Sequence, residues 1–264
     1  MPEKSDSRSV RAKGAVAWLL TFASGNVDIL GFIGIYKLFT AHVTGTSVQL
    51  ARSLVRGNWP EAAIAGVLVG AFFLVSIVGR AIIEAGARTK FRKIASVTLA
   101  LEAVMIGWLG FSASSLLANP PGGAGVTTFT LYVLIGTLSC AMGLQTATLT
   151  AVGPLTVHTT FVTGMINKLA EITSHVFFGA YDLIRKTSRQ EREVRSKLRD
   201  DCGKAGFLFG IWVAYVAGAA TGTWLYRPLG LRAMFVSVAL LVVAIGADQV
   251  WGLSRQEEKE QSES

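Results

Sequence analysis

Long apolar runs, separated by short blocks that hold most of the charge, are the feature that most constrains the fold of this chain. The runs cover approximately residues 14–36, 61–83, 94–111, 126–153, 205–226 and 231–251. Each is close to the ~20 residues that a helix needs to cross the hydrocarbon core of a bilayer. Only 16% of the 264 residues are charged, against about a quarter in soluble domains. The sequence therefore predicts an all-α, polytopic membrane protein with six transmembrane helices.

The composition argues against several other classes of protein. The formal charge of +8 comes from basic residues beside the apolar runs rather than from a basic face, so no nucleic-acid partner is expected. Neither Cys140 nor Cys202 belongs to a CxxC or Cys/His pattern, and the three histidines lie far apart, so no metal or other cofactor is expected. Because no nucleophile, metal or phosphate-loop motif stands in a suitable context, the chain is not expected to be an enzyme.

The distribution of lysine and arginine predicts the orientation in the membrane. With the N-terminus in the cytoplasm, 20 of the 25 basic residues lie on the cytoplasmic side and five on the other. Loops rich in Lys and Arg stay inside. We therefore expect a bacterial inner (plasma) membrane protein with both termini cytoplasmic.

Two similar polar segments indicate an internal repeat. Residues 39–46 and 158–165 share a Val-Thr-Gly core, and Thr44 is followed by Thr163 after a shift of 119 residues. A polar Gly-containing stretch precedes each, at 25–28 and at 143–146. Since each half would hold three spans, the second half must cross the membrane in the opposite sense. We expect two inverted three-helix repeats with broken first helices and amphipathic or re-entrant segments.

These boundaries divide the chain into five parts. The ends are a disordered cytoplasmic tail over 1–13 and a second cytoplasmic tail over 253–264. The first repeat covers 14–115, an external linker 116–125, and the second repeat 126–252. A charged cytoplasmic insertion at 185–204 lengthens the second repeat, and an amphipathic helix over 165–184 precedes it.

Polar residues within or beside the apolar runs are the candidate site for a substrate or ion. An ionisable side chain at bilayer depth is costly and usually functional, so Asp28 is the strongest candidate and Glu102 the second. The alternative for Asp28 is a structural role in holding a broken helix. The full candidate set is Asn26, Asp28, His42, Thr44, Gly45, Glu102, Gln145, Thr160, Thr163, Gly164 and Asn167.

The order and spacing of these motifs resemble a known family. Gly25-x-x-Asp28 and His42-x-Thr44-Gly45 in the first half are followed by Gly143-Leu144-Gln145 and Thr159-Thr160-x-x-Thr163-Gly164 in the second. This pattern resembles the YoaK-like family of bacterial inner-membrane proteins, catalogued as a domain of unknown function. The resemblance runs from about residue 14 to 250. It implies a six-span inner-membrane protein and supplies no substrate.

Two functions from different classes remain open. Inverted repeats with polar interruptions are typical of secondary transporters, so the first is a small permease for an unknown small solute, with possible proton coupling. The second is a non-transporting scaffold or sensor that acts through the cytoplasmic 165–204 region. The bilayer is the expected partner in both, and a homo-oligomer is left open.

Overall fold

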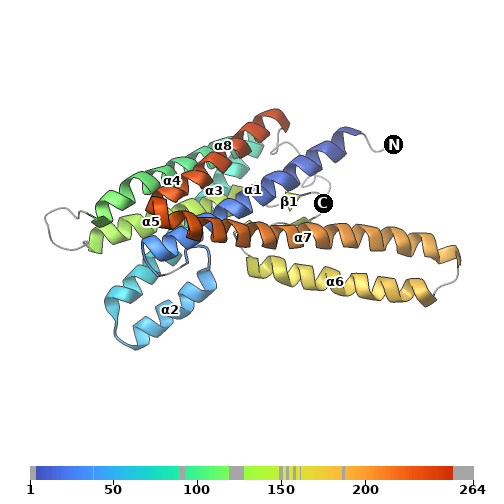
Figure 1. Cartoon of the computed structure of the whole chain (residues 1–264), viewed down its shortest axis with the longest axis horizontal. Helices are drawn as coiled ribbons and strands as arrows, with labels where there is room; N and C mark the ends of the chain where they lie inside the picture. The colour runs from blue at the N-terminus through green and yellow to red at the C-terminus, as the bar shows by residue number, and fades with distance from the viewer. Residues whose placement is uncertain are drawn as a thin grey trace.

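The protein is a bundle of long helices, as a computed structural model shows (Figure 1). The structure describes residues 4–37, 39–89, 93–118, 128–148, 151–152, 155–156, 159–160, 162–185 and 188–251. The first half contains α1 (Lys4–Gly34), α2 (Val43–Val55), α3 (Trp59–Arg88) and α4 (Ile94–Ala118). The second contains α5 (Thr128–Thr148), α6 (Val162–Arg185), α7 (Ser188–Leu229), the 3-10 turn η1 (Gly230–Ala233) and α8 (Met234–Trp251).

A short hairpin connects α5 to α6. Strand β1 (Ala151–Val152) pairs antiparallel with β2 (Leu155–Thr156), with Ala151 opposite Thr156 and Val152 opposite Leu155. Two residues per strand are too few to build a sheet, so the described fold is essentially helical. The predicted all-α class is confirmed at this level.

Local sequence signals set several helix ends. Asn58 caps α3: its side-chain oxygen accepts a bond from the Glu61 amide at 3.4 Å, and its amide group donates to the Glu61 carboxylate at 2.9 Å. The Asn58 oxygen thus satisfies a free amide of the first turn, which also contains Pro60. Gly57 and Gly230 have φ of +69° and +59°, and they end α2 and α7 in the left-handed conformation that glycine adopts without strain.

Helices α1 and α5 form the centre of the bundle. In the apolar stretch of each membrane-length segment, 67% of the residues of α1 and 50% of those of α5 are buried inside the protein, against 28–39% in the other such segments. Helix α1 packs against α7 and α8, and α5 packs against α3 and α4. Helix α4 packs against α8, α2 against α3, and α6 against α7. The packing repeats between the two halves when α1 is exchanged with α5, α2 with α6, α3 with α7 and α4 with α8. The α1–α7 pair then becomes α3–α5, α1–α8 becomes α4–α5, and α2–α3 becomes α6–α7, while α4–α8 maps onto itself.

The bundle exterior is strongly apolar. Exposed side chains include Phe73, Leu74, Ile77 and Val78 on α3, Phe111 on α4, and Val242 and Val243 on α8. Five segments among the described residues are long and apolar enough to cross a membrane: Ala12–Gly34, Trp59–Gly86, Ile94–Leu117, Thr128–Thr148 and Glu191–Val250. The last is 60 residues long and contains most of α7 and α8 with η1 between them. The expected spans at 205–226 and 231–251 both fall in it.

The predicted breaks in the first helix of each half are wrong. Helix α1 is continuous through residues 25–28, and α5 is continuous through 143–146. The polar side chains there find partners on other elements, so the helices need not unwind to satisfy them. Helix α1 also begins at Lys4, which corrects the predicted disordered tail for residues 4–13.

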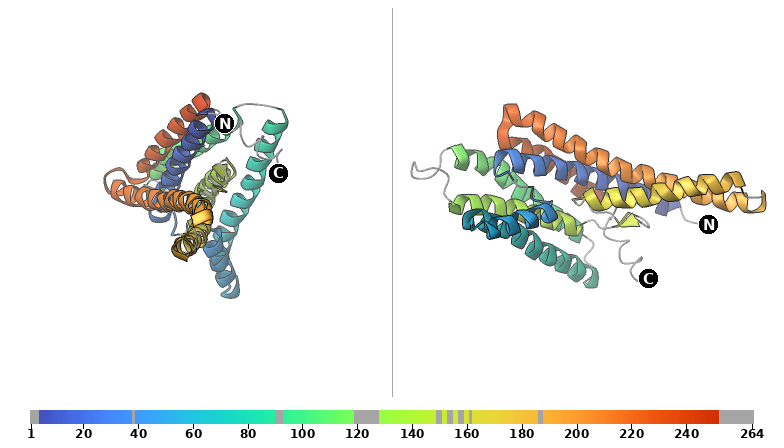
Figure 2. Two further views of the ribbon diagram at one scale, coloured as in Figure 1. Left: turned by 90° about the vertical axis from the view of Figure 1, so that its right-hand side faces the viewer. Right: turned by 90° about the horizontal axis from the view of Figure 1, so that it is seen from below.

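Other boundaries shift as well. Helix α4 extends to Ala118, inside the predicted 116–125 linker, whose remaining residues lie outside the described part of the chain, as does the 253–264 tail. From Ser188 onward the charged insertion is the first part of α7 rather than a separate element. Helices α6 and α7 run side by side, and their paired ends extend beyond the bundle (Figures 1 and 2).

Candidate functional site

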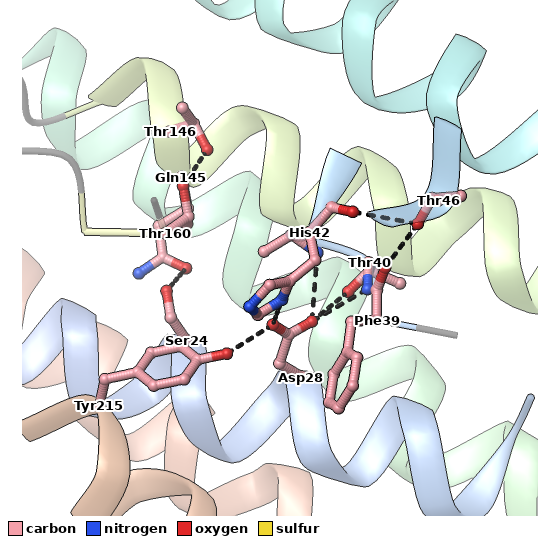
Figure 3. A network of polar contacts seen from close by, with 11 residues as sticks. Ser24, Asp28, Phe39, Thr40, His42, Thr46, Gln145, Thr146, Thr160 and Tyr215 are labelled. Atoms are coloured by element: carbon pink, nitrogen blue, oxygen red, sulfur yellow. Dashed lines mark hydrogen bonds and ion pairs between the residues drawn. The ribbon is translucent and has the colours of Figure 1, made fainter. Parts of the chain in front are cut away.

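A buried carboxylate joins α1 to the connection that leads into α2 (Figure 3). Asp28 is only 1% exposed. Its Oδ1 accepts bonds from the Thr40 amide at 3.0 Å, the Thr40 hydroxyl at 2.9 Å and the Ala41 amide at 3.2 Å. Its Oδ2 accepts a bond from the Tyr215 hydroxyl of α7 at 2.7 Å and lies 3.3 Å from Nδ1 of His42. We call this set the first loop contact.

Five donors around one carboxylate stabilise its charged form despite its burial. The contact therefore fixes the connection before α2 onto both α1 and α7. A cavity of about 10 Å³ adjoins Thr40 among residues of α1, α3 and α5, which is room for about one water molecule. The first loop contact is thus closed and tightly packed.

His42 is the titratable member at the edge of this contact. Its side chain is 42% exposed, and its ring packs against Phe39 with centroids 5.0 Å apart. The hydrogen bond to Asp28 and the negative charge of that carboxylate raise the pKa of the imidazole, and partial burial opposes them. The cationic form of His42 therefore stabilises the contact.

The second half has a corresponding but simpler contact. Thr146 in α5 and Thr160, just before α6, have hydroxyl oxygens 2.5 Å apart. Thr146 also lies 2.8 Å from the Met142 carbonyl of its own helix. We call the Thr146–Thr160 pair the second loop contact. Asp28 and Thr146 are 118 residues apart in sequence, and Ala41 and Thr160 are 119 apart.

Neutral polar side chains connect α1 to α5 and to α8. Gln145 of α5 accepts a bond from the Ser24 hydroxyl of α1 at 3.0 Å and donates to the Leu20 carbonyl at 2.7 Å. Asn26 of α1 accepts a bond from the Ser237 hydroxyl of α8 at 2.9 Å, and its amide nitrogen has no partner among the described residues. All four of these polar side chains are fully buried.

Glycines permit the close helix crossings that hold these groups together. A Cβ at Gly25 would lie 2.1 Å from the Tyr215 carbonyl oxygen, and a Cβ at Gly218 would lie 2.0 Å from that of Phe22. At the α3–α5 crossing, a Cβ at Gly143 would lie 2.7 Å from the Phe72 carbonyl oxygen. The α1–α7 crossing therefore has no room for a side chain, and the α3–α5 crossing has little more.

Asp201, Asp248 and Glu102 of α4 are also buried carboxyl groups, and Glu102 shares no contact with Asp28. Glu102 is 0% exposed, and neither carboxyl oxygen has a hydrogen-bond partner among the described residues. It takes no part in either loop contact.

The structure brings together some of the predicted candidates and separates others. Asp28 and His42 share the first loop contact, and Thr160 belongs to the second. Gln145 bonds to Ser24 between α5 and α1, whereas Asn26 bonds to Ser237 of α8. Thr44, Thr163 and Asn167 are exposed on α2 and α6, Gly164 is half-buried, and a Cβ at Gly45 would meet nothing within 4 Å. The residues before the Val-Thr-Gly cores, rather than the cores themselves, make the buried contacts; His158 and Phe161 lie outside the described residues.

Sequence reasoning missed Tyr215, Thr40, Ser24, Ser237 and Thr146 as members of this network. Tyr215 lies 187 residues from Asp28, and no spacing rule connects them. The internal repeat could have identified Thr146, because it occupies the position in the second half that Asp28 occupies in the first.

Comparison with known proteins identifies the family. The model of a family described as "Protein of unknown function (DUF1275)" matches residues 16–247. The chain belongs to the DUF1275 family. One relative is the UPF0700 transmembrane protein YoaK of Bacillus subtilis (strain 168). It is 26% identical to this chain over 166 residues, which cover 61% of this chain and 67% of the relative. No solved structure matches the chain.

Membership of the DUF1275 family confirms the resemblance to YoaK-like proteins. The membrane-length helices, the apolar exterior and the transmembrane relative agree. The chain is a multi-pass integral membrane protein of a family whose function is unknown.

Proposed function

We propose that this DUF1275 protein is a small secondary transporter of the bacterial inner membrane, in which two inverted three-helix halves move a small polar solute. The halves are 14–115 and 126–252, giving six spans with both termini in the cytoplasm. The basic-residue distribution supports this orientation. The helix packing supports the repeat, because exchanging the helices of one half for those of the other preserves its main pairs.

The observation that carries the proposal is the pair of loop contacts at equivalent positions of the two halves. In each half, one side chain of the central helix binds residues just before the amphipathic helix. In inverted halves these contacts lie toward opposite membrane faces, and releasing them in turn would open the interior first to one side and then to the other.

The interior between the contacts suits an uncharged polar solute or the polar part of a larger one. Ser24 and Gln145 offer donors and acceptors there, and Asn26 and Ser237 do so at the α1–α8 packing, all without a formal charge. The unpartnered amide nitrogen of Asn26 is a donor available to a ligand. A solute that forms these bonds would compensate for the bonds between helices that must break to admit it.

Flux measurements on purified protein in sealed proteoliposomes test the proposal. A panel of small polar solutes should include at least one that enters saturably and faster than into empty liposomes. Asp28→Ala should lower that flux severalfold, because the first half can no longer close. Thr44→Ala, on the exposed face of α2, is the matched control and should transport normally. If every solute enters at the rate of empty liposomes, with and without a pH gradient, the protein is not a transporter of this kind.

A second candidate function has a separate observation in its favour. The paired ends of α6 and α7 extend beyond the bundle and enclose a groove of about 400 Å³, lined by residues that include His175, Asp182, Glu193, Lys197 and Asp201. A scaffold or sensor would use such a groove to bind a cytosolic partner. Charge reversal at Glu193 and Lys197 should then abolish the cellular phenotype of the protein, whereas a transporter should retain its flux after the same changes.

A further inference from the structure

We infer that Glu102, and not Asp28, holds the exchangeable proton of this protein, and that this proton moves to and from the side of the membrane where α4 begins. The inference deepens the proposed function. Only the coupling of this proton to transport rests on that function; the proton site itself does not. It depends on the different surroundings of the two buried carboxyl groups.

Asp28 is poorly suited to exchange a proton. Its two oxygens face five donors, including the amides of Thr40 and Ala41 and the His42 imidazole. Protonating the carboxylate would leave a hydroxyl group facing donors, and it would break bonds that hold the first loop contact. Asp28 therefore stays charged while the contact is closed.

Glu102 has the opposite surroundings. It is 0% exposed, and neither oxygen has a hydrogen-bond partner in the part of the chain that the structure describes. A charged carboxylate there would lose its hydration without gaining hydrogen bonds in return. The cost of such a buried, uncompensated charge is many kcal/mol, and groups in this situation take up a proton instead. In the closed bundle Glu102 is therefore a neutral carboxylic acid.

The elements around α4 bring no basic group to this carboxyl group. Helix α4 packs against α5, α8, η1 and α3. Their titratable or charged residues are Tyr132 and Cys140 on α5, Asp248 on α8, Arg232 on η1, and Glu61, Arg80, Glu84 and Arg88 on α3. Among the described residues, none of these forms a hydrogen bond with Glu102.

The other buried polar side chains described on α4 lie toward its start. One turn toward the start of α4 is Thr98, whose hydroxyl accepts a bond from Thr148 of α5 at 3.1 Å. Half a turn further, the amide and hydroxyl of Ser96 both donate to the Asp248 carboxylate of α8. Toward the other end of α4, the buried residues are apolar: Ala103, Ile106, Leu109 and Ala113.

The Ser96–Asp248 pair lies near the start of α4, a few residues after the basic segment at 80–93. The proposed orientation puts that segment in the cytoplasm. The proton thus leaves the Glu102 carboxyl group, passes toward Thr98 and the Ser96–Asp248 pair, and is accepted by water at that surface. The carboxylate left behind must take up a new proton before the closed bundle forms around it again. Transport of the uncharged solute is coupled to this release and uptake.

Labelling with dicyclohexylcarbodiimide, an apolar reagent that modifies protonated carboxyl groups, tests the inference on the full-length protein in lipid vesicles. Peptide mapping of the wild type should locate the modification at Glu102, in excess over Asp28 by roughly tenfold or more. Above the titration point of Glu102, labelling should fall by about tenfold for each pH unit. Glu102→Gln should remove the modification.

The direction of proton movement is tested by a pH jump applied from the side of residues 80–93. Thr98→Val should slow the change in labelling after the jump. Thr21→Val is the matched control, because the Thr21 hydroxyl is equally buried and bonds at 2.7 Å to the Ala17 carbonyl of its own helix. An unchanged rate in Thr98→Val would overturn the proposed direction.

Modification of Asp28 in place of Glu102, or no modification of Glu102 at any pH, would overturn the assignment. The outcome is separate from that of the transporter proposal. A labelled Glu102 in a protein that moves no solute would refute transport and retain the proton site. Proton-coupled flux that is equal in wild type and Glu102→Gln would refute the role of Glu102 in a working transporter.

Discussion

The two loop contacts occupy equivalent places in the two halves but differ greatly in strength. In the first, a buried carboxylate accepts bonds from two backbone amides, two hydroxyl groups and an imidazole. In the second, two threonine hydroxyl groups share one bond. The difference teaches that corresponding contacts can be held with very unequal strength. In the proposed transport cycle, the side of the second loop contact should therefore open more readily than the first.

Removing one side chain from each contact should have the largest and most unequal effects. Asp28→Ala leaves buried amides without a partner, and loss of one member of a buried charged contact costs about 3–5 kcal/mol. Thr160→Val removes one neutral hydrogen bond and should cost about 1 kcal/mol. Denaturant titration of each variant in detergent measures its free energy of unfolding, and the difference from wild type gives both costs. Equal costs would contradict the unequal closure of the two sides.

Filling the glycine crossings compares the α1–α7 pair with the α3–α5 pair, its counterpart when the helices of the two halves are exchanged. Gly218→Ala places a Cβ 2.0 Å from the Phe22 carbonyl oxygen, and Gly143→Ala places one 2.7 Å from that of Phe72. Overpacking usually costs about 1–3 kcal/mol, and we expect Gly218→Ala at or above the upper end and Gly143→Ala below it. Gly206→Ala is the control, since nothing lies within 4 Å of its Cβ.

The yield and melting temperature of the detergent-solubilised variants measure these effects. A Gly218→Ala protein as stable as Gly206→Ala would show that the α1–α7 crossing is not closely packed. The α1–α7 geometry, and with it the position of Tyr215 beside Asp28, would then need revision.

A smaller effect distinguishes the contacts by pH. Because the pKa of His42 is raised in the folded protein, its cationic form contributes stability that is complete below the unfolded value of about 6.5. That contribution is lost as the pH rises through the higher folded value. The melting temperature should therefore fall slightly as the pH rises above about 6.5, and His42→Gln should flatten this dependence. Thr160→Val should leave it unchanged, and a steeper slope in His42→Gln would be the contrary result.

The fold was predictable wherever one helix face or one apolar run decides it. The apolar runs predicted the long helices, and the three- and four-residue spacing from Met165 to Leu183 predicted the amphipathic α6. The continuity of α1 was not predictable, because Gly25-Asn26 followed by Asp28 has the composition of a break. In the structure Gly25 admits the Tyr215 carbonyl and Asn26 binds Ser237 of α8, so both are helical for reasons of tertiary packing.

The candidate site was predictable in part for the same reason. Intramembrane polarity identified Asp28 and Glu102, and the repeat identified the segments that supply His42 and Thr160. Neither signal carries information about partners, so the sequence ranked Asp28 as the proton-exchanging group. The surrounding donors at Asp28 and their absence at Glu102 become visible only once the helices are packed.

The central claim is that the two loop contacts lie toward opposite faces of the membrane, and thiol accessibility tests it directly. Thr44→Cys and Asn167→Cys are both at exposed positions, on α2 and α6, close to the first and second loop contacts. They would be introduced singly after Cys140 and Cys202 are replaced by serine. In intact cells, a membrane-impermeant maleimide should label Thr44→Cys from outside, and Asn167→Cys only after the membrane is permeabilised. Labelling of both positions from the same side would contradict the inverted halves and the alternating opening that depends on them.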